Sequence, residues 1–344
     1  MNKENKYFFR NLVFEGGGVK GIAYVGALEV LQEAGIFERI ERVAGTSAGA
    51  IVAVLLGIGY TPEEIKKIMW ELDFKNFMDD SWGVVRDANR LISEFGWYKG
   101  DFFRAWIGSL IARKLGNSEA TFDDLIHCSD PALKSKQIYL VGTNLSTGFS
   151  EIFSHEHTPR FCIADAVRIS MSIPIFFAAK RNFRGDLYVD GGMLDNYPVK
   201  VFDRRKYVKK DWMRTEYYES INQELRDRCR RISDYVYNKQ TLGFRLDSKE
   251  KISMFRDQAE PPKRQIDDLW DYTTALLNTL IDAQENSHLH SDDWQRTIYI
   301  DTLGVKATDF AIEEQKKQEL LDSGRNYTTA YLEWYDNSEP KANK

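Results

Sequence analysis

The sequence predicts an α/β fold: a three-layer α/β/α sandwich around a central, mostly parallel sheet. Two observations support this prediction. Short apolar runs that suit strands alternate along the chain with longer runs that have helical spacing. In addition, two glycine-rich loops each lie between such a strand and such a helix, an arrangement typical of βα units. We find no internal repeat and no low-complexity segment that would favour another architecture.

The individual elements follow from apolar spacing and turn residues. Residues 21–34, for example, carry apolar side chains at helical intervals, at Ile22, Val25, Leu28 and Leu31. Strands are expected near Leu12–Phe14, Arg42–Ala44, Gln137–Thr143, Phe149–Phe153, Leu187–Val189 and Thr297–Ile300. Helices are expected at Gly21–Ala34, Ala48–Gly57, Pro62–Glu71, Val84–Ser93, Phe102–Leu115, Ile163–Met171, Ile266–Asn286, Ala311–Leu321 and Tyr327–Tyr335.

A Gly-x-Ser-x-Gly pentapeptide centred on Ser47 is the most informative motif of the chain. It runs from Gly45 to Gly49, after an expected strand and before an apolar helix, which is the context of a nucleophile elbow. The flanking glycines allow a sharp turn without Cβ clashes, so the serine hydroxyl can project from it. We therefore predict that Ser47 is a catalytic nucleophile. The alternative is a glycine-rich turn in which Ser47 caps the helix.

A second glycine loop, Gly16-Gly17-Gly18-Val19-Lys20-Gly21, lies between the first expected strand and the first expected helix. Such a loop leaves backbone N–H groups unpaired, and these groups can bind a phosphate or an oxyanion. A dinucleotide site is a poor match, because only Glu38 or Glu41 could serve as its acidic residue. The Walker pattern is absent from the loop. Near a nucleophilic serine, the loop is better interpreted as an oxyanion hole.

The third motif is Asp190-Gly191-Gly192, which follows a short expected strand. Taken alone, Asp-Gly is a routine hairpin signal, and a simple turn would explain it. Together with the other two motifs, in this order along the chain, it becomes specific.

The three motifs together resemble the pattern of the patatin-like phospholipase family. That pattern is Gly-Gly-Gly-x-Lys/Arg-Gly, then Gly-x-Ser-x-Gly, then Asp-Gly-Gly or Asp-Gly-Ala. The matching segments here are Gly16–Gly21, Gly45–Gly49 and Asp190–Gly192. Two further stretches also look like the family: Ser170–Phe177 and Asp195–Pro198.

The resemblance implies a catalytic Ser-Asp dyad. By position, Ser47 would be the nucleophile and Asp190 the general base. An aspartate with a pKa near ~4 is a weak base in water, so it must be buried to raise its pKa. Lys20 would add charge beside the loop or pin it, and its place at a helix start favours pinning. The implied oxyanion donors are Gly16, Gly17 and Gly18. The supporting motif glycines are Gly21, Gly45, Gly49, Gly191 and Gly192.

A Ser-Asp-His triad remains an alternative, because His288 or His290 would satisfy the α/β-hydrolase order after Ser47 and Asp190. Both histidines lie in a polar stretch, however, and we interpret them as surface or loop residues. The same interpretation applies to His127, His155 and His157. No further ligands accompany the paired histidines at a recognisable spacing, so we predict no metal and no cofactor.

The domain boundaries follow the extent of the resemblance. Residues 8–200 are expected to form the catalytic core, with an aromatic-rich helical insertion at about 74–118. Residues 201–296 are assigned to an insertion, lid or regulatory segment of unknown role, since 203–290 match no motif. Residues 297–336 would complete the core with a last strand and C-terminal helices.

Two segments are candidates for membrane contact. Phe74–Lys114 is rich in aromatic residues, which favour the water–lipid boundary, although an ordinary packed insertion explains it equally well. Arg204–Trp212 holds five basic residues within seven, next to Tyr207 and Trp212, and could seat anionic headgroups. The alternative for this second segment is a solvated loop, because acidic residues follow it closely.

Length and composition fit a cytoplasmic enzyme. The 344 residues suffice for one large α/β domain with insertions or for two smaller domains, and the net charge of −5 argues against nucleic-acid binding. Met1–Lys6 is polar, and the longest apolar run, Ala50–Ile58, is too short to span a bilayer. Three unclustered cysteines suit a reducing cytosol, although a protein secreted without a signal peptide would look the same.

We therefore expect a metal-independent serine acyl hydrolase of the phospholipase A type, which contacts membranes peripherally and forms an acyl-Ser47 intermediate. The ester is better supported than the phospholipid, because galactolipids, neutral lipids, lysolipids or transacylation would use the same dyad. One alternative is a membrane-damaging effector activated by a partner or a small nucleotide, with a sensor surface in 203–290. Another is an inactive lipid-binding module, although all three motifs are intact.

Overall fold

The computed structural model describes most of the chain. The described residues are 6–78, 94–130, 133–210, 212–228, 234–249, 251 and 292–337, with single positions between 263 and 283. The helix expected at Val84–Ser93 and most of the helix expected at Ile266–Asn286 lie outside them, as do His288 and His290.

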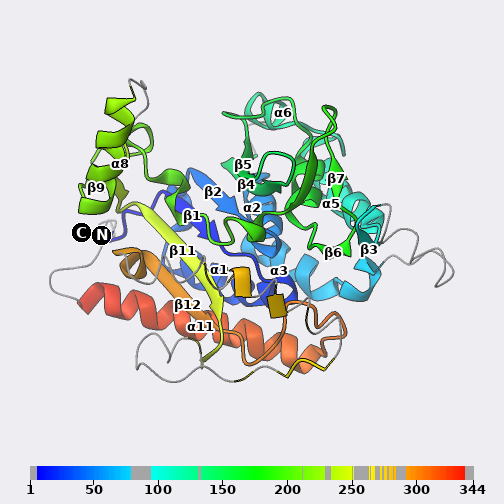
Figure 1. Ribbon diagram of the computed structural model, residues 1–344. Coiled ribbons are helices and arrows are strands. Elements are labelled where there is room, and N and C mark those ends of the chain that lie inside the picture. The colour runs from blue at the N-terminus through cyan, green and yellow to red at the C-terminus, as the bar shows by residue number, and fades with distance from the viewer. Residues whose placement is uncertain are drawn as a thin grey trace.

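An eight-stranded mixed sheet runs through the molecule in the order β12-β11-β1-β2-β4-β8-β7, and β5 also pairs with β4 (Figure 1). Every pair from β12 to β4 is parallel, whereas β5, β8 and β7 pair antiparallel. The expected α/β sandwich with a mostly parallel sheet is confirmed. The strands are β1 (Asn11–Phe14), β2 (Arg42–Gly45), β4 (Gln137–Asn144), β5 (Phe149–Ser154), β7 (Lys180–Arg181), β8 (Leu187–Asp190), β11 (Thr241–Asp247) and β12 (Thr297–Asp301).

The central strands are buried on both faces. Because side chains alternate along a strand, Leu12 and Phe14 of β1 join the larger hydrophobic core, while Val13 joins a smaller one on the opposite face. Tyr139 of β4 and Ala44 of β2 also belong to the smaller core. Burial on two faces explains why these strands appear in the sequence as short, nearly continuous apolar runs.

Helices cover the larger core. The helix α2 (Ala48–Gly57) is buried along its whole length, and α1 (Ala23–Glu33) packs against α11 (Glu314–Asn337), which runs beside β12 in Figure 1. The smaller core is covered by the 3₁₀ turns η5 (Val199–Phe202) and η6 (Arg205–Tyr207). The remaining α-helices are α3 (Pro62–Glu71), α5 (Asp101–Leu115), α6 (Phe122–Ile126), α7 (Ile163–Ser170) and α8 (Glu216–Asp227).

Two smaller strand pairs and some further 3₁₀ turns complete the described elements. The pairs join β3 (Gly96–Tyr98) to β6 (Ile175–Phe177) in parallel and β9 (Trp212–Met213) to β10 (Tyr237–Asn238) antiparallel. The turns are η1 (Gly18–Ile22), η2 (Phe37–Arg39), η3 (Phe74–Phe77), η4 (Gly191–Met193) and η7 (Asp292–Arg296).

The strand β11 was not expected, and it lies inside the sheet between β1 and the edge strand β12. Only one of its faces is apolar, whereas the other carries Gly243 and the charged Arg245 and Asp247, all of them buried. A Cβ at Gly243 would lie 1.8 Å from the hydroxyl oxygen of Tyr197, so glycine is required there. Part of segment 201–296 therefore belongs to the sheet.

The two helices expected at Ala311–Leu321 and Tyr327–Tyr335 form one continuous helix, α11. The small residues Ser323 and Gly324 lie in the stretch between the two expected helices. In the structure, Ser323 Oγ donates a hydrogen bond of 2.6 Å to the carbonyl of Asp301, and Gly324 lies directly against the carbonyl of Ala23. These residues allow close packing of the helix and do not end it.

A buried ion cluster ties the segment after the third motif to the last strand. Arg296 is fully buried and binds Asp203 through both of its Nη atoms, each at 2.6 Å. Its guanidinium also pairs with Asp293, and Asn238 donates to the carbonyl of Phe202 at 2.9 Å. Since every charge has a partner in this cluster, burial is tolerated and the covering segment is held in place.

In the described part of the aromatic segment Phe74–Lys114, most rings are packed. Phe77, Phe103 and Ile107 are buried in the larger core, and Phe77 contacts Phe103 edge to face with ring centroids 5.0 Å apart. These contacts favour the interpretation as a packed insertion over that of a membrane-facing one.

The basic residues of Arg204–Trp212 are also largely engaged within the protein. Arg204 stacks on the ring of Tyr235, Arg205 stacks on the ring of Trp212, and Lys206 pairs with Glu156. Only Lys209 and Lys210 of this stretch are left exposed without a described partner.

The close contact between α1 and α11 predicts that one methyl group added at Gly26 lowers the stability of the protein. A Cβ at Gly26 would lie 1.9 Å from the carbonyl oxygen of Leu321 and 2.8 Å from the backbone nitrogen of Arg325. Because both neighbours are backbone atoms, neither can move aside cheaply. We expect Gly26→Ala to lower the free energy of unfolding by about 1–3 kcal/mol, measured by urea denaturation.

Gly108→Ala in α5 is the matched control. There the new Cβ has no neighbour nearer than 3.5 Å. The higher helix propensity of alanine should then raise stability by up to about 1 kcal/mol. If Gly26→Ala were as stable as Gly108→Ala, α1 and α11 would not approach each other as closely as the structure shows.

Candidate active site

Ser47 sits at the turn between β2 and α2, in a backbone conformation that few residues adopt. Its φ of 53° and ψ of −123° are sterically unfavourable for a residue with a Cβ. The neighbouring glycines make the turn feasible, because a Cβ at Gly45 would lie 2.2 Å from the carbonyl oxygen of Gly49. Ser47 is only 4% exposed, and its N–H donates to Ser170 Oγ at 2.9 Å. The predicted strand, elbow and helix are all present.

Asp190 reaches the same place because two strands meet end to end. β2 pairs with the first half of β4 and ends at Gly45, opposite Leu140. β8 pairs with the second half of β4 and ends at Asp190, opposite Gly142. β5 pairs with β4 along residues 139–144, so β2 and β8 must share the other side of β4. Two positions along a strand correspond to about 7 Å, which brings the two strand ends together.

The Asp190 carboxyl group is buried and only partly hydrogen bonded. Its Oδ1 accepts a hydrogen bond of 2.7 Å from the Gly192 N–H, while Oδ2 has no hydrogen-bond partner among the described residues. Burial raises the pKa of Asp190 to about 7, although the bond from Gly192 and the nearby Ser47 hydroxyl lower it in part. In this conformation the Ser47 hydroxyl points to Met171 Sδ at 3.5 Å.

The glycine loop lies against the elbow. A Cβ at Gly16 would lie 3.1 Å from the Cβ of Ser47, so the loop passes directly beside the serine. The N–H of Gly16 donates to the carbonyl of Asn196 at 3.0 Å and is therefore not available to an oxyanion. The N–H groups of Gly17 and Gly18 have no partner among the described residues. Of the three glycines expected as donors, these two keep that capacity.

The segment after the third motif joins all three motifs. Besides the backbone bond to Gly16, the side chain of Asn196 lies within 2.3 Å of where a Gly16 Cβ would be and 2.8 Å of a Gly192 Cβ. Thr46 Oγ1 donates to the carbonyl of Asp195 at 2.9 Å. In the sequence, Asp195–Pro198 was noted only because it looks like the corresponding stretch of the patatin-like family. The structure shows in addition that this segment connects the loops.

The loop also rests on buried charges that the sequence analysis missed. Arg245 Nε lies 3.4 Å from Glu15 Oε1 and 3.1 Å from Asp247 Oδ2, and all three side chains are buried. Glu15 Oε2 accepts a hydrogen bond of 2.6 Å from the Leu246 N–H. Lys20 Nζ donates to the carbonyl of Leu246 at 3.2 Å. These contacts fasten the start of the glycine loop to the end of β11.

None of the described histidines lies at this site. His127 and His155 lie beside Asp123, with Nδ1 atoms 3.4 Å and 3.5 Å from its Oδ1. His157 Nδ1 contacts Ser154 Oγ at 2.8 Å. His288 and His290 are outside the described residues, so the triad alternative is left for experiment.

One described side-chain group has the composition of a metal site. Glu119, Cys162 and Asp165 place their ligand atoms within 4.8 Å of one another. Arg104, however, donates to Asp165 at 3.0 Å and to Glu119 at 2.6 Å. The arginine already supplies the positive charge at this cluster, so the group is better explained as an ion-pair network.

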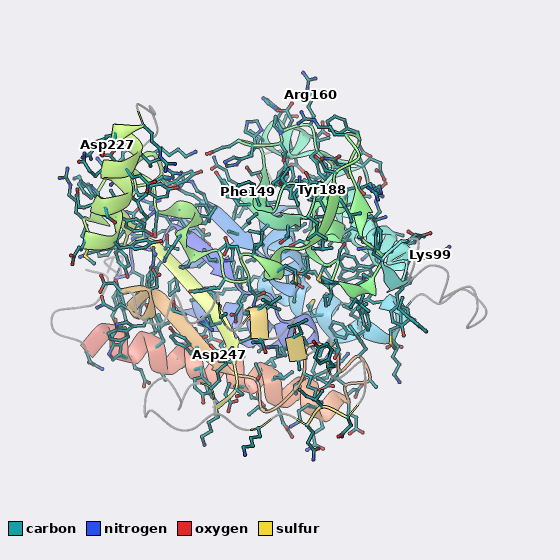
Figure 2. All side chains as sticks on the ribbon, in the orientation of Figure 1. Lys99, Phe149, Arg160, Tyr188, Asp227 and Asp247 are labelled. Carbon is teal, nitrogen blue, oxygen red and sulfur yellow. The ribbon has the colours of Figure 1, made fainter. Side chains whose placement is uncertain are left out.

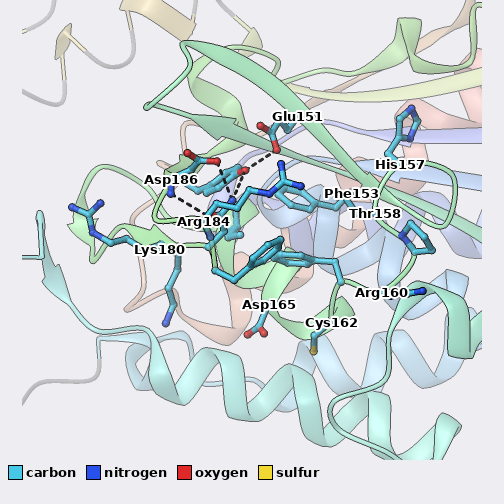
Figure 3. Close-up of a pocket in the computed structure, with 17 residues that line it drawn as sticks. Glu151, Phe153, His157, Thr158, Arg160, Cys162, Asp165, Lys180, Arg184 and Asp186 are labelled. Atoms are coloured by element: carbon cyan, nitrogen blue, oxygen red, sulfur yellow. Dashed lines mark hydrogen bonds between the residues drawn. The ribbon is translucent and has the colours of Figure 1, made fainter.

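A cavity of about 790 Å³ is lined by residues between Glu151 and Tyr188 (Figure 3). Neither Ser47 nor Asp190 lines it, but two elements that carry the site border it through Tyr188 of β8 and Ile169 of α7. No helix in the described part of the chain is long and apolar enough to cross a membrane.

Comparisons with known proteins identify the family and the fold that this chain resembles. Residues 12–203 match the model of a family described as patatin-like phospholipase. YqhO of Bacillus subtilis (strain 168) is 30% identical over 93% of this chain and 97% of its own length. The cGAMP-activated phospholipase of Escherichia coli (strain TW11681) is 25% identical over 56% of this chain and 54% of its own length.

Among solved structures, VipD from Legionella pneumophila aligns with a TM-score of 0.57. The alignment covers 95% of this chain and 67% of VipD, at 20% sequence identity. Similarity at this level supports the fold.

The buried carboxyl group predicts how stability changes with pH. Since burial raises the pKa of Asp190 to about 7, the unfolded chain loses the proton near pH 4 while the folded protein keeps it until about pH 7. The stabilising contribution is complete below pH 4 and is lost as the pH rises to 7. We expect the Asp190→Asn variant to gain stability relative to the wild type over this range, by on the order of 4 kcal/mol.

Urea denaturation of both proteins at pH 4, 5.5, 7 and 8 measures this difference. Asp227→Asn, at an exposed position on α8, is the matched control. A constant difference between the wild type and Asp190→Asn at all four pH values would show that the carboxyl group is not desolvated.

Proposed function

Because the chain belongs to the patatin-like phospholipase family, we propose that it is a phospholipase A that cleaves fatty-acyl esters of glycerophospholipids. The observation that carries this proposal is the end-to-end meeting of β2 and β8, which sets buried Ser47 beside buried Asp190. The name of the E. coli relative supports a phospholipid substrate. A cytoplasmic location with peripheral membrane contact is part of the same proposal.

In the first step, Asp190 accepts the hydroxyl proton of Ser47 while Oγ attacks the ester carbonyl carbon. The carbonyl oxygen becomes an oxyanion, which accepts hydrogen bonds from the N–H groups of Gly17 and Gly18. One donor of this kind contributes roughly 3–4 kcal/mol to the transition state. When the tetrahedral intermediate collapses, the alcohol product leaves with the proton from Asp190, and the acyl group remains on Ser47.

In the second step, Asp190 accepts a proton from water as the water oxygen attacks the acyl carbonyl carbon. The same two N–H groups stabilise the second oxyanion, and α2 directs the positive end of its dipole toward it. Collapse breaks the ester bond to Ser47, whose Oγ takes the proton back from Asp190. The products are a free fatty acid and the original enzyme.

Desolvation is what makes an aspartate effective in this role. A general base works best when its pKa is close to the working pH, because it is then both deprotonated and able to hold a proton. Burial moves the pKa of Asp190 to about 7, into this range. The unpaired Oδ2 is the atom left to accept the proton.

One second candidate is favoured by a specific observation. The E. coli relative is named for activation by cGAMP, so this chain is also a candidate for a phospholipase that is silent until an activator binds. A purified wild type that releases fatty acid only after cell extract is added would support this candidate. Full activity of the purified protein would exclude it.

Replacement of either dyad residue is expected to abolish turnover. Ser47→Ala removes the nucleophile and Asp190→Asn removes the base, so each should lower kcat at least about a thousandfold. Fatty-acid release from mixed phospholipid vesicles in EDTA measures this effect. Loss of wild-type activity in EDTA would show that a metal is required.

The His288→Ala/His290→Ala double variant is the control for a triad. Under the proposed dyad it keeps wild-type activity. Loss of activity in a folded double variant would show that the site uses a Ser-Asp-His triad and that the proposed dyad is wrong.

The rate should also depend on pH through Asp190. Because only the carboxylate can accept the serine proton, kcat/KM should rise about tenfold per pH unit below pH 7 and level off above it. A pH series with a soluble short-chain ester tests this without changing a membrane surface. A profile that is flat from pH 5 to 8 would contradict a base with a pKa of about 7.

A further inference from the structure

Two hairpin turns lie side by side at the edge of the sheet that carries the site. The first turn, residues 145–148, joins β4 to β5, and the second, residues 182–186, joins β7 to β8. The Leu145 N–H donates to the Leu187 carbonyl at 2.8 Å, and the Leu187 N–H donates to Ser146 Oγ at 2.9 Å. These bonds hold the two turns together as one surface, which we call the hairpin edge.

The hairpin edge presents large apolar side chains to solvent. Phe183, in the second turn, is 87% exposed, and Phe149, the first residue of β5, is 70% exposed. Leu145 is 51% exposed. Phe149 lies opposite Asn144 of β4, across from Tyr188 on the neighbouring strand (Figure 2). No other large hydrophobic residue in the described part of the chain is as exposed as these two phenylalanines, and such exposure is a cost unless a partner covers it.

Positive charge surrounds these aromatic rings. Arg181 and Arg184 flank Phe183 in the second hairpin, and the guanidinium of Arg184 lies 5.3 Å from the Phe183 ring centroid. Both arginines line the cavity beside the hairpin, together with Lys180 and Arg160, which lie toward opposite ends of it (Figure 3). An exposed aromatic residue between two arginines suits a surface that is apolar inside and anionic outside.

The acidic residues of the same cavity all have hydrogen-bond or ion-pair partners within the protein. Asp165 pairs with Arg104 at 3.0 Å, outside the cavity lining. Glu151 accepts a hydrogen bond of 2.7 Å from the Tyr188 hydroxyl, and Asp186 accepts one of 3.2 Å from Asn182. Glu151 and Asp186 are half-buried, whereas Arg181 and Arg184 are exposed, so the two arginines are the charges that the turns present most openly to solvent.

The hairpin edge points beyond the site along the same strands. Asp190 ends β8 opposite Gly142, whereas Phe149 lies opposite Asn144, and the turns continue past it. At about 3.3 Å per residue, the tips project roughly 10 Å past Asp190. A flat surface that touches both turns would thus lie on the side of the sheet toward which β2 and β4 run past the Ser47 turn.

We propose that the hairpin edge docks the protein on an anionic phospholipid bilayer, with Phe149 and Phe183 inserted among the headgroups and Arg181 and Arg184 on their phosphates. This inference rests on the proposed function, since it explains how a substrate in a membrane reaches Ser47. It differs from the two segments that the sequence suggested, whose described side chains are mostly packed or paired within the protein.

Vesicle flotation of the Ser47→Ala protein tests the docking surface without turnover. Binding to vesicles of phosphatidylcholine with phosphatidylglycerol is compared with binding to phosphatidylcholine alone, at 50 and 300 mM salt. We expect binding to the anionic vesicles, weakened by salt. Failure to bind the anionic vesicles would overturn the proposal, whether or not the wild type hydrolyses soluble esters.

Two variants then locate the surface. In the Ser47→Ala background, Phe149→Ala/Phe183→Ala should weaken vesicle binding at least tenfold, and Arg181→Gln/Arg184→Gln should weaken it about thirtyfold for the anionic vesicles. Unchanged melting temperatures confirm that each variant is folded. Unaltered binding in both folded variants would overturn the proposal.

Matched controls come from the other candidate surface. Lys209→Gln/Lys210→Gln removes two exposed charges from the basic stretch, and Tyr217→Ala removes a ring that is 54% exposed on α8. Both should bind vesicles as the parent does. If the lysine variant lost binding instead, the basic stretch would be the docking surface and the hairpin edge would not.

Failure of the docking surface and failure of the proposed function are distinguishable. Flotation reports contact with lipid, whereas hydrolysis of a soluble short-chain ester by the wild type reports the dyad. If the protein hydrolyses the ester but does not float with vesicles, the proposed chemistry stands and the hairpin edge is not a docking surface. If the protein floats with vesicles but cleaves no ester, the docking surface stands and the proposed chemistry is wrong.

Discussion

The site depends on a single packing constraint: β2 and β8 share one side of β4. Because β2 ends opposite Leu140 and β8 ends opposite Gly142, the carboxyl ends of two strands that run in opposite directions face each other. Each end carries a tight glycine turn, and each turn holds one side chain of the proposed dyad, Ser47 or Asp190. A difference of one residue in either register would turn a side chain to the other face of the sheet. The hydrogen bonds of β4 thus determine the geometry of the site.

Buried charged groups of two kinds occur in the molecule: groups that are paired with opposite charges, and Asp190, which is not. Arg296 with its aspartates, and Arg245 with Glu15, are surrounded by opposite charges, so each cluster fixes the segments that it joins. Asp190 instead receives one backbone hydrogen bond and faces no described cation. An under-compensated carboxyl group lowers stability but keeps its affinity for a proton. Energetic strain is therefore concentrated at the position where a base is useful.

The three motifs could be located from the sequence because each places several glycines directly after a short apolar run, where a tight turn must follow a strand. The β11 strand could not, since its charged face is buried and its Arg245 interrupts the apolar pattern that identifies strands. The blocked N–H of Gly16 was equally invisible, because its partner, Asn196, lies 180 residues away. The hairpin edge depends on two turns that only strand pairing brings together. Local patterns predict local elements, whereas contacts between distant segments require the fold.

The hydrogen bond from the Val19 N–H to the Ala307 carbonyl has a consequence for biosynthesis. Gly18 lies so close to Ala307 that a Cβ there would be 2.0 Å from its carbonyl oxygen. The first glycine loop of the chain thus takes its shape against a residue that the ribosome adds almost 300 positions later. In a nascent chain this contact can form only after residue 307 has been added, so the loop reaches the shape seen here late in synthesis.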